Sequence, residues 1–417
     1  MKNGKFITLG IETSCDETAA AVTANGRDVL SNIIASQIDV HKVFGGVVPE
    51  IASRHHLTQI NAVMDAALAE AGVAWRDIDL VGATKGPGLV GAVLIGLSTA
   101  KAVAYAAGKP LAATHHIKGH VCASYLNTVS ADMSATAFDC PDVAPKTEAS
   151  ELSMEYSIDE TDTNSFVSLG FAPETHSQTA GLHIEPPHLA LVVSGGHTDL
   201  IDVRSYTEYK LLGHTRDDAV GEAFDKVARV LGLGYPGGPK IDEIAKNGNP
   251  NAVEFKRVYL EEGSLDFSFS GIKTAVLNYI NTERQAATRQ KETVASASQD
   301  KNRSPLSPPP ERDVNVADIA ASFEASVVDV ITAKTRAALR STGYKKLTMG
   351  GGVAANSMLR ERIASLCADE GVELYAPQPI YCTDNAAMIA CAAYYQFKEQ
   401  GPSPLDTDAY ATLPLQI

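Results

Sequence analysis

The chain has 417 residues, which exceeds the size at which a single hydrophobic core usually stops growing, so at least two globular units are expected. Its formal net charge of −15 argues against a protein that coats nucleic acid by bulk attraction, although basic residues do gather in the second half, at Lys334, Arg336, Arg340, Lys345, Lys346, Arg360 and Arg362. The six cysteines show neither paired metal-ligand spacing nor the density of a disulfide framework, which indicates a reducing, cytoplasmic environment.

The chain begins with an apolar, strand-like run over residues 6–12, followed by a small polar turn, a second strand over 18–22 and a possible third near 28–33. Glu12 interrupts the first apolar run, which is therefore too short for a secretion signal. The turn from Glu12 to Glu17 is acidic. It would repel a bare phosphate unless a metal or another cation lay between them.

The longest apolar stretch, Leu89 to Ala100, is closed by Lys101 and falls short of the ~20 residues of a membrane span, so no membrane segment is expected. His116 and His120 follow. On a helix, residues four apart project from one face and could hold one metal ion. A zinc protease would need Glu directly after the first histidine, but Ile117 stands there. The pair is therefore half a metal site, or a chance pair on a solvated face.

Two segments lack sustained apolar periodicity. Residues 127–186 are rich in Ser, Thr, Asp, Glu and Pro, which predicts an acidic insertion of low complexity. Residues from about 282 to 313 contain the proline-rich run Ser304–Pro310, which cannot continue a helix. We interpret both segments as excursions from the fold.

Residues 189–203 repeat the plan of the first hairpin, again with a possible third strand, near 209–212. This internal echo predicts a duplicated α/β fold with a cleft between its halves. We expect a first lobe over residues 1–126, with C-terminal helices at about 387–417 packing back on it, and a second lobe over 187–386. The turn at Ser194, Gly195 and Gly196 could bind an anion through its amides, although an ordinary hairpin has the same composition.

Three further motifs favour a nucleotide. A helical pattern over residues 217–231 carries Asp225, which could accept a hydrogen bond from a sugar hydroxyl. The loop 234–239 is rich in Gly and Pro and allows a flat ligand to approach closely. Residues 350–356 lie between an apolar strand and a helix, which is the context of a nucleotide-binding glycine loop. Each motif alone could be a plain turn.

Thr383, Asp384 and Asn385 precede a helical pattern over residues 386–395. Thr383 or Asp384 could simply cap that helix. Asp384 could instead supply a carboxylate oxygen to a metal. Together with His116 and His120 it would form a set of two imidazoles and one carboxylate, with positions left open for substrate.

These motifs, taken in order, resemble the bacterial tRNA N6-adenosine threonylcarbamoyltransferase family, formerly described as a sialoglycoprotein endopeptidase. The resemblance covers nearly the whole chain except the two insertions. It is carried by Gly10–Thr18, Phe44–Glu50, Gly86–Leu89, Val193–Thr198, Gly221–Lys226, Tyr235–Pro239, Phe267–Gly271 and Gly351–Asn356.

The resemblance implies an actin-like, sugar-kinase-like fold of two ribonuclease-H-like halves. It implies transfer of a threonylcarbamoyl group from threonylcarbamoyl-adenylate to the N6 amine of the adenosine beside the anticodon, at position 37 of tRNAs that read ANN codons. The implied metal is iron(II), with zinc as the alternative. The implied metal ligands are His116, His120 and Asp384, the implied catalytic residue is Glu12, and the implied nucleotide contacts are Val192, Val193, Ser194, Gly195, Gly196, Asp225, Gly238, Asp242 and Asn356.

The family also implies a paralogous actin-like partner subunit and a small P-loop ATPase. One departure concerns Lys118, because the family usually has Glu at this position between the histidines. Two other functions are compatible with these motifs. An ATP-dependent kinase or chaperone of the same fold would usually place acidic residues in both hairpins, whereas the second hairpin here is Ser-Gly-Gly-His. A noncatalytic scaffold subunit of a tRNA-modifying complex is the third possibility.

Overall fold

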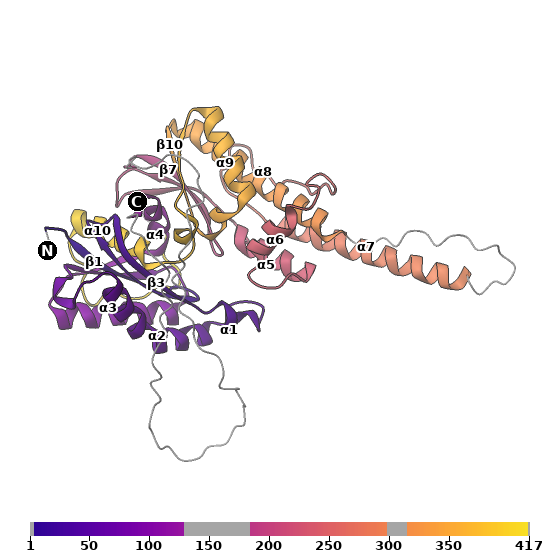
Figure 1. Ribbon diagram of the computed structural model, residues 1–417. Helices are drawn as coiled ribbons and strands as arrows, with labels where there is room; N and C mark the ends of the chain where they lie inside the picture. The colour runs from indigo at the N-terminus through magenta and orange to yellow at the C-terminus, as the bar shows by residue number, and fades with distance from the viewer. Residues whose placement is uncertain (1–3, 129–183, 298–314, 416–417) are drawn as a thin grey trace, which may run out of the picture.

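The computed structural model describes residues 4–128, 184–297 and 315–415, which form two lobes, each built on a mixed β-sheet (Figure 1). The first sheet contains β1 (Ile7–Glu12), β2 (Glu17–Ala24), β3 (Asp28–Ser36), β4 (Leu80–Gly86), β5 (Leu111–His115) and β6 (Asn127–Thr128), in the order β5-β4-β1-β2-β3-β6. The second contains β7 (His188–Val193), β8 (Thr198–Val203), β9 (Tyr209–His214), β10 (Lys346–Gly350) and β11 (Glu373–Tyr375), in the order β11-β10-β7-β8-β9.

The second sheet therefore repeats the order of the first five strands of the first. In both lobes the opening hairpin is antiparallel, and its first strand pairs in parallel with a later strand, β4 in one lobe and β10 in the other. The predicted echo between the two hairpins is confirmed, including the third strands β3 and β9. Their alternating apolar residues pack into one core per lobe.

The helices of the first lobe cover both faces of its sheet. The helices α2 (Pro49–Glu70) and α3 (Val90–Ala107) pack on one face, α10 (Ala386–Gln400) packs on the other, and the short α1 (Ile38–Lys42) lies before α2. A Cβ on Gly10 would lie 2.3 Å from the carbonyl oxygen of Ala386, so only glycine lets α10 approach β1 this closely. The C-terminal helix thus returns to the first lobe.

The second lobe carries α5 (Val220–Leu231), α6 (Gly237–Ala245), α7 (Ser270–Ala297), α8 (Val316–Thr342) and α9 (Ser357–Glu370). Between the lobes lies α4 (His116–Cys122), which contacts α10 on one side and β7 and β10 on the other. The described residues also include four short 3-10 helices, at Trp75–Asp77, Ala123–Tyr125, Gly352–Ala355 and Pro379–Tyr381.

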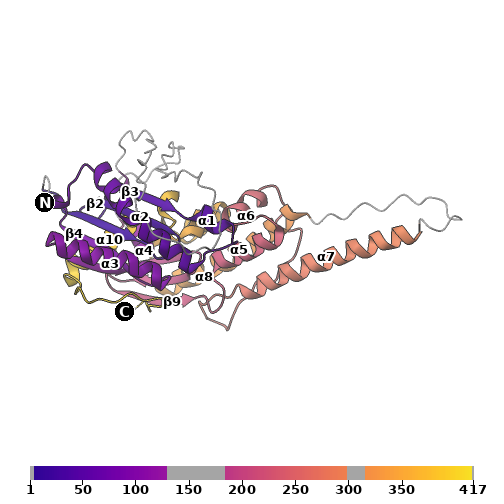
Figure 2. The same cartoon turned by 90° about the horizontal axis from the view of Figure 1, so that it is seen from below.

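Helix α7 projects from the body of the molecule (Figure 2) and runs to Ala297, so it continues through the first half of the segment interpreted as a proline-rich insertion. The sequence explains this, because the first proline after Ser270 is Pro305. Residues 298–314, and residues 129–183 of the acidic insertion, lie outside the described residues. One described helix, α3, is long and apolar enough to cross a membrane by composition, but it packs against α2 and β4 in the first lobe.

Candidate metal centre and nucleotide loops

Three predicted metal ligands meet at the boundary of the two lobes. His116 and His120 project from one face of α4, and Asp384 reaches them from the turn before α10. One ligand atom from each of the three lies within 4.8 Å of the others. The Oδ1 of Asp384 is 3.4 Å from Nε2 of His116 and 3.2 Å from Nε2 of His120. The residues converge as the sequence predicted.

Local structure aims these side chains. Helix α4 starts directly after β5, and the imidazole of His115 caps it by accepting a hydrogen bond from the amide of Ile117. At α10 the cap is Asn385, whose Oδ1 accepts from the amide of Met388. The alternative in which Thr383 or Asp384 caps this helix is therefore wrong, and the Asp384 carboxylate stays available.

The donor set fits a divalent metal. His120 is fully buried, its Nδ1 has no hydrogen-bond partner among the described residues, and its Nε2 meets only the Asp384 carboxylate, at 3.2 Å. A buried imidazole with so few polar partners is costly, and a metal ion held by Nε2 would offset part of that cost. Two imidazoles and a carboxylate are also ligands that iron(II) and zinc accept with positions left open.

The neighbouring carboxylate of Glu12 sets the orientation of His116. Its Oε2 lies 3.1 Å from Nδ1 of His116, and it accepts a further hydrogen bond from the hydroxyl of Thr84. Because a carboxylate can only accept, Nδ1 of His116 carries the proton and Nε2 is left free for a metal. The predicted catalytic residue thus lies fully buried behind a metal ligand.

The charges of the cluster are strongly coupled. Burial opposes the imidazolium form of His116, but the carboxylates of Asp384 and Glu12 outweigh it and raise the pKa of His116 to about 9. Burial likewise opposes the Asp384 carboxylate, but His116 and His120 hold the pKa of Asp384 well below its ordinary value. Without a metal, a proton on His116 supplies the positive charge that the two carboxylates require.

Lys118 points away from this cluster. Its ammonium donates to the carbonyl oxygen of Thr207 at 2.8 Å and lies 4.7 Å from the ring centroid of Tyr209. Burial lowers the pKa of Lys118. The departure from the family pattern therefore adds a link between α4 and the second lobe, and the metal ligands keep their positions.

The turn at Ser194, Gly195 and Gly196 has two amides without a hydrogen-bond partner among the described residues. The Ser194 amide already donates to the carbonyl oxygen of His197, so the amides of Gly195 and Gly196 remain for a ligand. Both glycines are exposed, and a Cβ on either would meet open space. Val192 and Val193 are buried within β7, so only their backbone can face a ligand.

The N-terminus of α5 supports this turn. The amide of Gly221 donates to the carbonyl oxygen of Ser194, and a Cβ on Gly221 would lie 2.7 Å from the Cα of Gly195. The positive end of the helix dipole therefore sits against the turn, which favours an anion there.

The remaining predicted nucleotide residues form one connected group. Asp225 on α5 accepts from the amide of Gly237 at 2.7 Å, next to Gly238 at the start of α6. Asp242 on α6 accepts from the amide and hydroxyl of Ser357, next to Asn356 at the start of α9. Each of these side chains braces the N-terminus of a neighbouring helix, which orients amides and hydroxyls around one region.

The glycine loop after β10 joins this region to the metal ligands. A Cβ on Gly350 would lie 2.4 Å from the carbonyl oxygen of His120, and a Cβ on Gly351 would lie 2.3 Å from that of Val193. Backbone from the second lobe therefore touches both the metal-bearing helix and the end of β7. This close approach brings the end of β7, where the glycine turn begins, next to the helix that carries His116 and His120.

Sequence reasoning missed two residues of this site. His197 is next to the glycine turn, where burial and then the His116 and His120 imidazoles lower its pKa to about 3. Glu324 on α8 accepts from the Asn356 amide at 2.6 Å, and burial raises the pKa of Glu324 to about 7. His197 could have been identified as a site residue because it directly follows the glycine turn in the sequence. Glu324 lies inside an apolar helical pattern, and nothing in that pattern indicates a binding role.

A family model described as tRNA N6-adenosine threonylcarbamoyltransferase matches residues 28–137 and 149–391 of the chain. The chain is 44% identical over 411 residues to the enzyme of that name from Clostridium beijerinckii, covering 99% of this chain and 98% of the relative. It is 46% identical over 392 residues to the one from Clostridioides difficile, covering 94% and 93%.

Among solved structures, HypF from T. kodakarensis has a TM-score of 0.51 at 12% identity, covering 97% of this chain and 49% of that one. At this identity the likeness concerns the fold alone. Together with the repeated sheet order, it confirms the expected actin-like, sugar-kinase-like fold class.

Proposed function

Because the chain belongs to the tRNA N6-adenosine threonylcarbamoyltransferase family, we propose that its metal cluster and glycine turn together bind the activated threonylcarbamoyl donor. The chain is an enzyme that forms threonylcarbamoyladenosine in tRNA. The observation that carries the proposal is the contact of the Gly350–Gly351 backbone with both His120 and Val193. This contact brings the metal cluster next to the glycine turn, so that one ligand can reach both.

The donor is threonylcarbamoyl-adenylate, a mixed anhydride that already carries a good leaving group. The N6 amine attacks its carbamoyl carbon, the new C–N bond forms, and the C–O bond to the phosphate breaks. Negative charge develops on the released AMP, and the amine gives up a proton. The protein therefore needs to orient the two reactants and stabilise an anion more than it needs a nucleophile of its own.

The amides of Gly195 and Gly196, at the positive end of α5, are placed to receive the phosphate oxygens. Asp225, Gly238, Asp242 and Asn356 surround the region for the ribose and base. Glu324 orients the amide group of Asn356, whose Oδ1 caps α9 at the same time. These contacts hold the adenylate while the tRNA amine approaches.

His116, His120 and Asp384 would hold the divalent metal, which as a Lewis acid would polarise donor oxygens and neutralise developing charge. Iron(II) is the metal we propose, with zinc as the alternative. Glu12 keeps the proton of His116 on Nδ1 and so keeps Nε2 available.

The direct test combines purified protein, threonylcarbamoyl-adenylate and unmodified tRNA, together with the proposed actin-like subunit and P-loop ATPase. The double variant His116→Ala, His120→Ala should lose both bound metal and transfer. A matched control is His55→Ala, because His55 lies on α2 away from the cluster. Normal transfer by the double variant would contradict the role of the metal, and metal analysis of protein purified without an affinity-metal resin would identify the ion.

We also propose that the chain works in the cytoplasm with a paralogous actin-like subunit and a small P-loop ATPase. A candidate surface for the paralogous subunit lies where α2 and α3 pack together. Leu57 on α2 and Val90 and Leu94 on α3 are each more than half exposed there, around the contact of Gly91 with Ser53. Leu57→Glu with Leu94→Glu should abolish co-purification of the partner, whereas Leu405→Glu, at an exposed leucine elsewhere, should not.

A further inference from the structure

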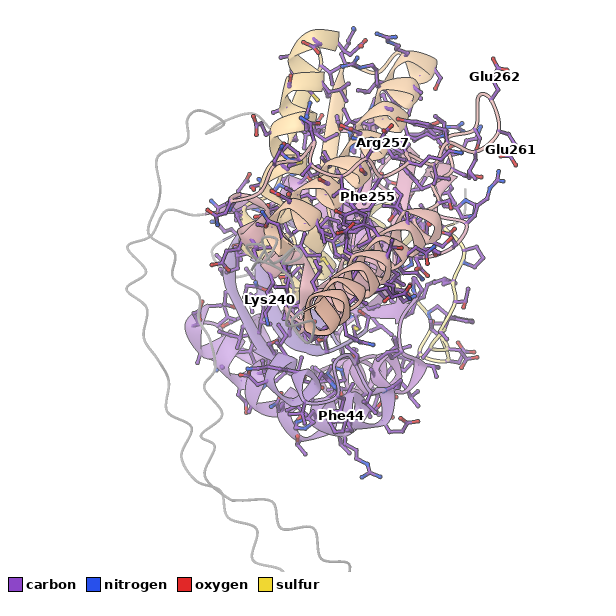
Figure 3. All side chains as sticks on the ribbon, turned by 90° about the vertical axis from the view of Figure 1, so that its right-hand side faces the viewer. Phe44, Lys240, Phe255, Arg257, Glu261 and Glu262 are labelled. Carbon is purple, nitrogen blue, oxygen red and sulfur yellow. The ribbon has the colours of Figure 1, made fainter. Side chains whose placement is uncertain are left out.

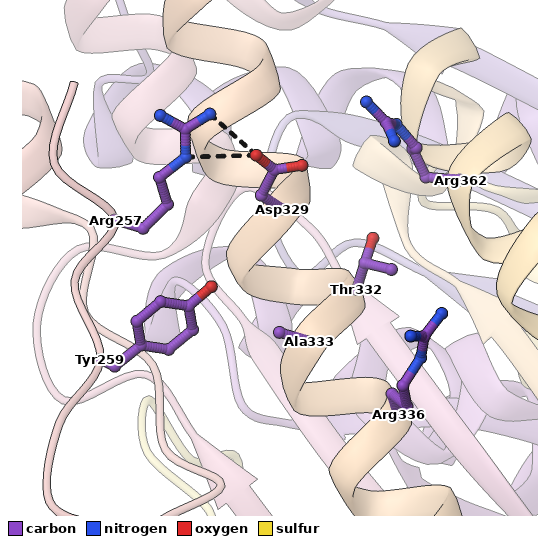
Figure 4. Close-up of a pocket in the computed structure, with 7 residues that line it drawn as sticks. All are labelled: Arg257, Tyr259, Asp329, Thr332, Ala333, Arg336 and Arg362. Carbon is purple, nitrogen blue, oxygen red and sulfur yellow. Dashed lines mark hydrogen bonds and ion pairs between the residues drawn. The ribbon is translucent and has the colours of Figure 1, made fainter. Parts of the chain in front are cut away.

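A cavity lies in the second lobe, beside helices α8 and α9. It has a volume of about 480 Å³ and is lined by residues of helix α8, helix α9 and the loop that leads to Phe267. Its lining residues are Arg257, Tyr259, Asp329, Thr332, Ala333, Arg336 and Arg362 (Figure 4). Three arginines and one carboxylate leave this lining with net positive charge in a chain of net charge −15.

The structure shows which of the basic residues between Lys334 and Arg362 have partners within the protein. Most members of this basic cluster have internal partners: Lys334, Lys345, Lys346 and Arg360 donate to backbone carbonyl oxygens, and Arg340 pairs with Glu370. Arg336 pairs with Asp369 and Glu370 and also lines the cavity, as does Arg362. The third arginine of the lining, Arg257, comes from a distant part of the chain. The tertiary structure therefore brings three arginines to one cavity, and of these Arg362 alone is without a partner among the described residues.

The three guanidinium groups differ in how far they are engaged. Arg257 donates from Nε and Nη2 to Oδ2 of Asp329, at 3.2 and 2.8 Å, and Arg336 donates to Asp369 at 3.3 Å. Arg362 is exposed and has no hydrogen-bond or ion-pair partner anywhere in the described part of the chain (Figure 4). An unpaired guanidinium beside two braced ones suits a phosphate group, which arginine binds through paired N–H donors.

Tyr259 gives the cavity an aromatic wall. Its side chain is 53% exposed, so the ring is not part of the core. Such rings beside arginines are the platforms on which nucleic-acid bases stack, whereas a binding site for a protein carboxylate would not require one. Phosphate-binding arginines and a stacking ring together favour a nucleotide unit.

The cavity lies within reach of an RNA bound at the metal centre. Helix α8 connects the two regions, since Glu324 contacts the candidate nucleotide residue Asn356 and Arg336 lies twelve residues further along the same helix. At 1.5 Å per residue that is about 18 Å along the axis. An RNA whose target adenosine lies near Asn356 can span this distance with a few nucleotides. Arg257 also lies in the second lobe above Lys240, on the side from which α7 projects (Figure 3).

We propose that this cavity binds the sugar-phosphate backbone of the tRNA substrate, a few nucleotides away from the adenosine that is modified. The inference rests on the proposed function, because it assumes that the target adenosine enters the site between the lobes. Arg362 contacts a phosphate directly, Arg257 and Arg336 complete the cationic wall, and Tyr259 packs against a sugar or base. The contact positions the RNA and does not read its sequence.

The test is steady-state threonylcarbamoyl transfer by the complete modification system, with donor saturating and tRNA varied, at several salt concentrations. Arg362→Glu should raise the KM for tRNA about tenfold and reduce the slope of log affinity against log salt by about one, with kcat and the KM for the donor unchanged. Tyr259→Ala should raise the same KM at least about fivefold, and Tyr259→Phe should not.

The matched control is Arg76→Glu, which makes the same change of charge at an exposed arginine in the first lobe. Equal KM values for the Arg362→Glu and Arg76→Glu variants would overturn the proposal, because bulk charge would then explain the effect. A titration with UMP tests the alternative that the cavity binds a free mononucleotide and not the tRNA backbone. If the Arg362→Glu variant lost UMP binding but kept a normal KM for tRNA, the cavity would be a mononucleotide site and the proposal would be overturned. Absence of transfer by the unmodified chain would refute the proposed function instead.

Discussion

Replacing Glu12 by Gln tests whether this buried carboxylate acts through His116 or takes part in the reaction itself. The substitution keeps the shape of the side chain and removes its charge. Oε1 of Glu12 accepts from the amide of Ser14 at 2.5 Å, so the oxygen of the glutamine should keep that position. The amide nitrogen would then face Nδ1 of His116, where Oε2 now lies 3.1 Å away.

This geometry reverses the tautomer of His116. An amide nitrogen donates, so Nδ1 of His116 must accept and its proton moves to Nε2, the atom that faces Asp384 and the metal position. The loss of one of the two carboxylates also lowers the pKa of His116 from about 9, so less of the ring is protonated in the metal-free protein. Loss of such an orienting partner typically weakens metal binding 10–100-fold, or about 1.4–2.7 kcal/mol.

The assay is a metal titration of the Glu12→Gln variant followed by transfer kinetics at limiting and at saturating metal. We expect weaker metal binding, with most of the activity restored when metal is in excess. A useful comparison is Thr84→Val, which removes one hydrogen bond to Glu12 without changing the charge of the site. A variant that binds metal with normal affinity and still loses kcat would refute this reasoning, and would show that Glu12 acts on the substrate.

Three other predictions follow from single contacts. Burial raises the pKa of Asp199 to about 7, so the native state keeps a proton that the unfolded chain releases near pH 4, and stability should fall between pH 4 and 7. The Asp199→Asn variant should be more stable than the unmodified chain above pH 7, by at most ~4 kcal/mol, as measured by thermal unfolding across that range. Gly221→Ala would push a methyl group against Gly195 at 2.7 Å, and should lower kcat on the order of 10–100-fold while metal analysis shows unchanged content. Lys118→Met loses the hydrogen bond to Thr207, and should destabilise the protein by about 1–3 kcal/mol in chemical denaturation while metal content stays the same; a loss of metal would show that Lys118 supports the ligands.

Much of the fold could be predicted because it is encoded by short-range patterns. The two hairpins that open the lobes show as apolar runs broken by small polar turns, and the structure confirms β1, β2, β7 and β8 at those places. The extent of α7 was not predicted, because the polar residues after Thr282 suggested an insertion although no proline interrupts the helix before Pro305.

The roles of Glu12, Lys118 and Arg257 depended on distance in space. Glu12 and His116 are 104 positions apart, and the sequence cannot state that one carboxylate lies behind one imidazole. Lys118 sits between two metal ligands in the sequence, yet its side chain turns to Thr207 because residues two apart on a helix project in different directions.

The sequence by itself determined the metal-ligand types, the glycine turns and the duplicated architecture, because spacing within a helix or hairpin dictates which side chains share a face. Only the tertiary structure decided that the helix carrying His116 and His120 meets the glycine loop after β10, through the approach of Gly350 to His120. It also decided that, among the described residues, Arg362 is the one member of the basic cluster without a partner. Those outcomes depend on how helices from distant segments pack, and packing is a property of the whole folded chain that no local pattern of residues contains.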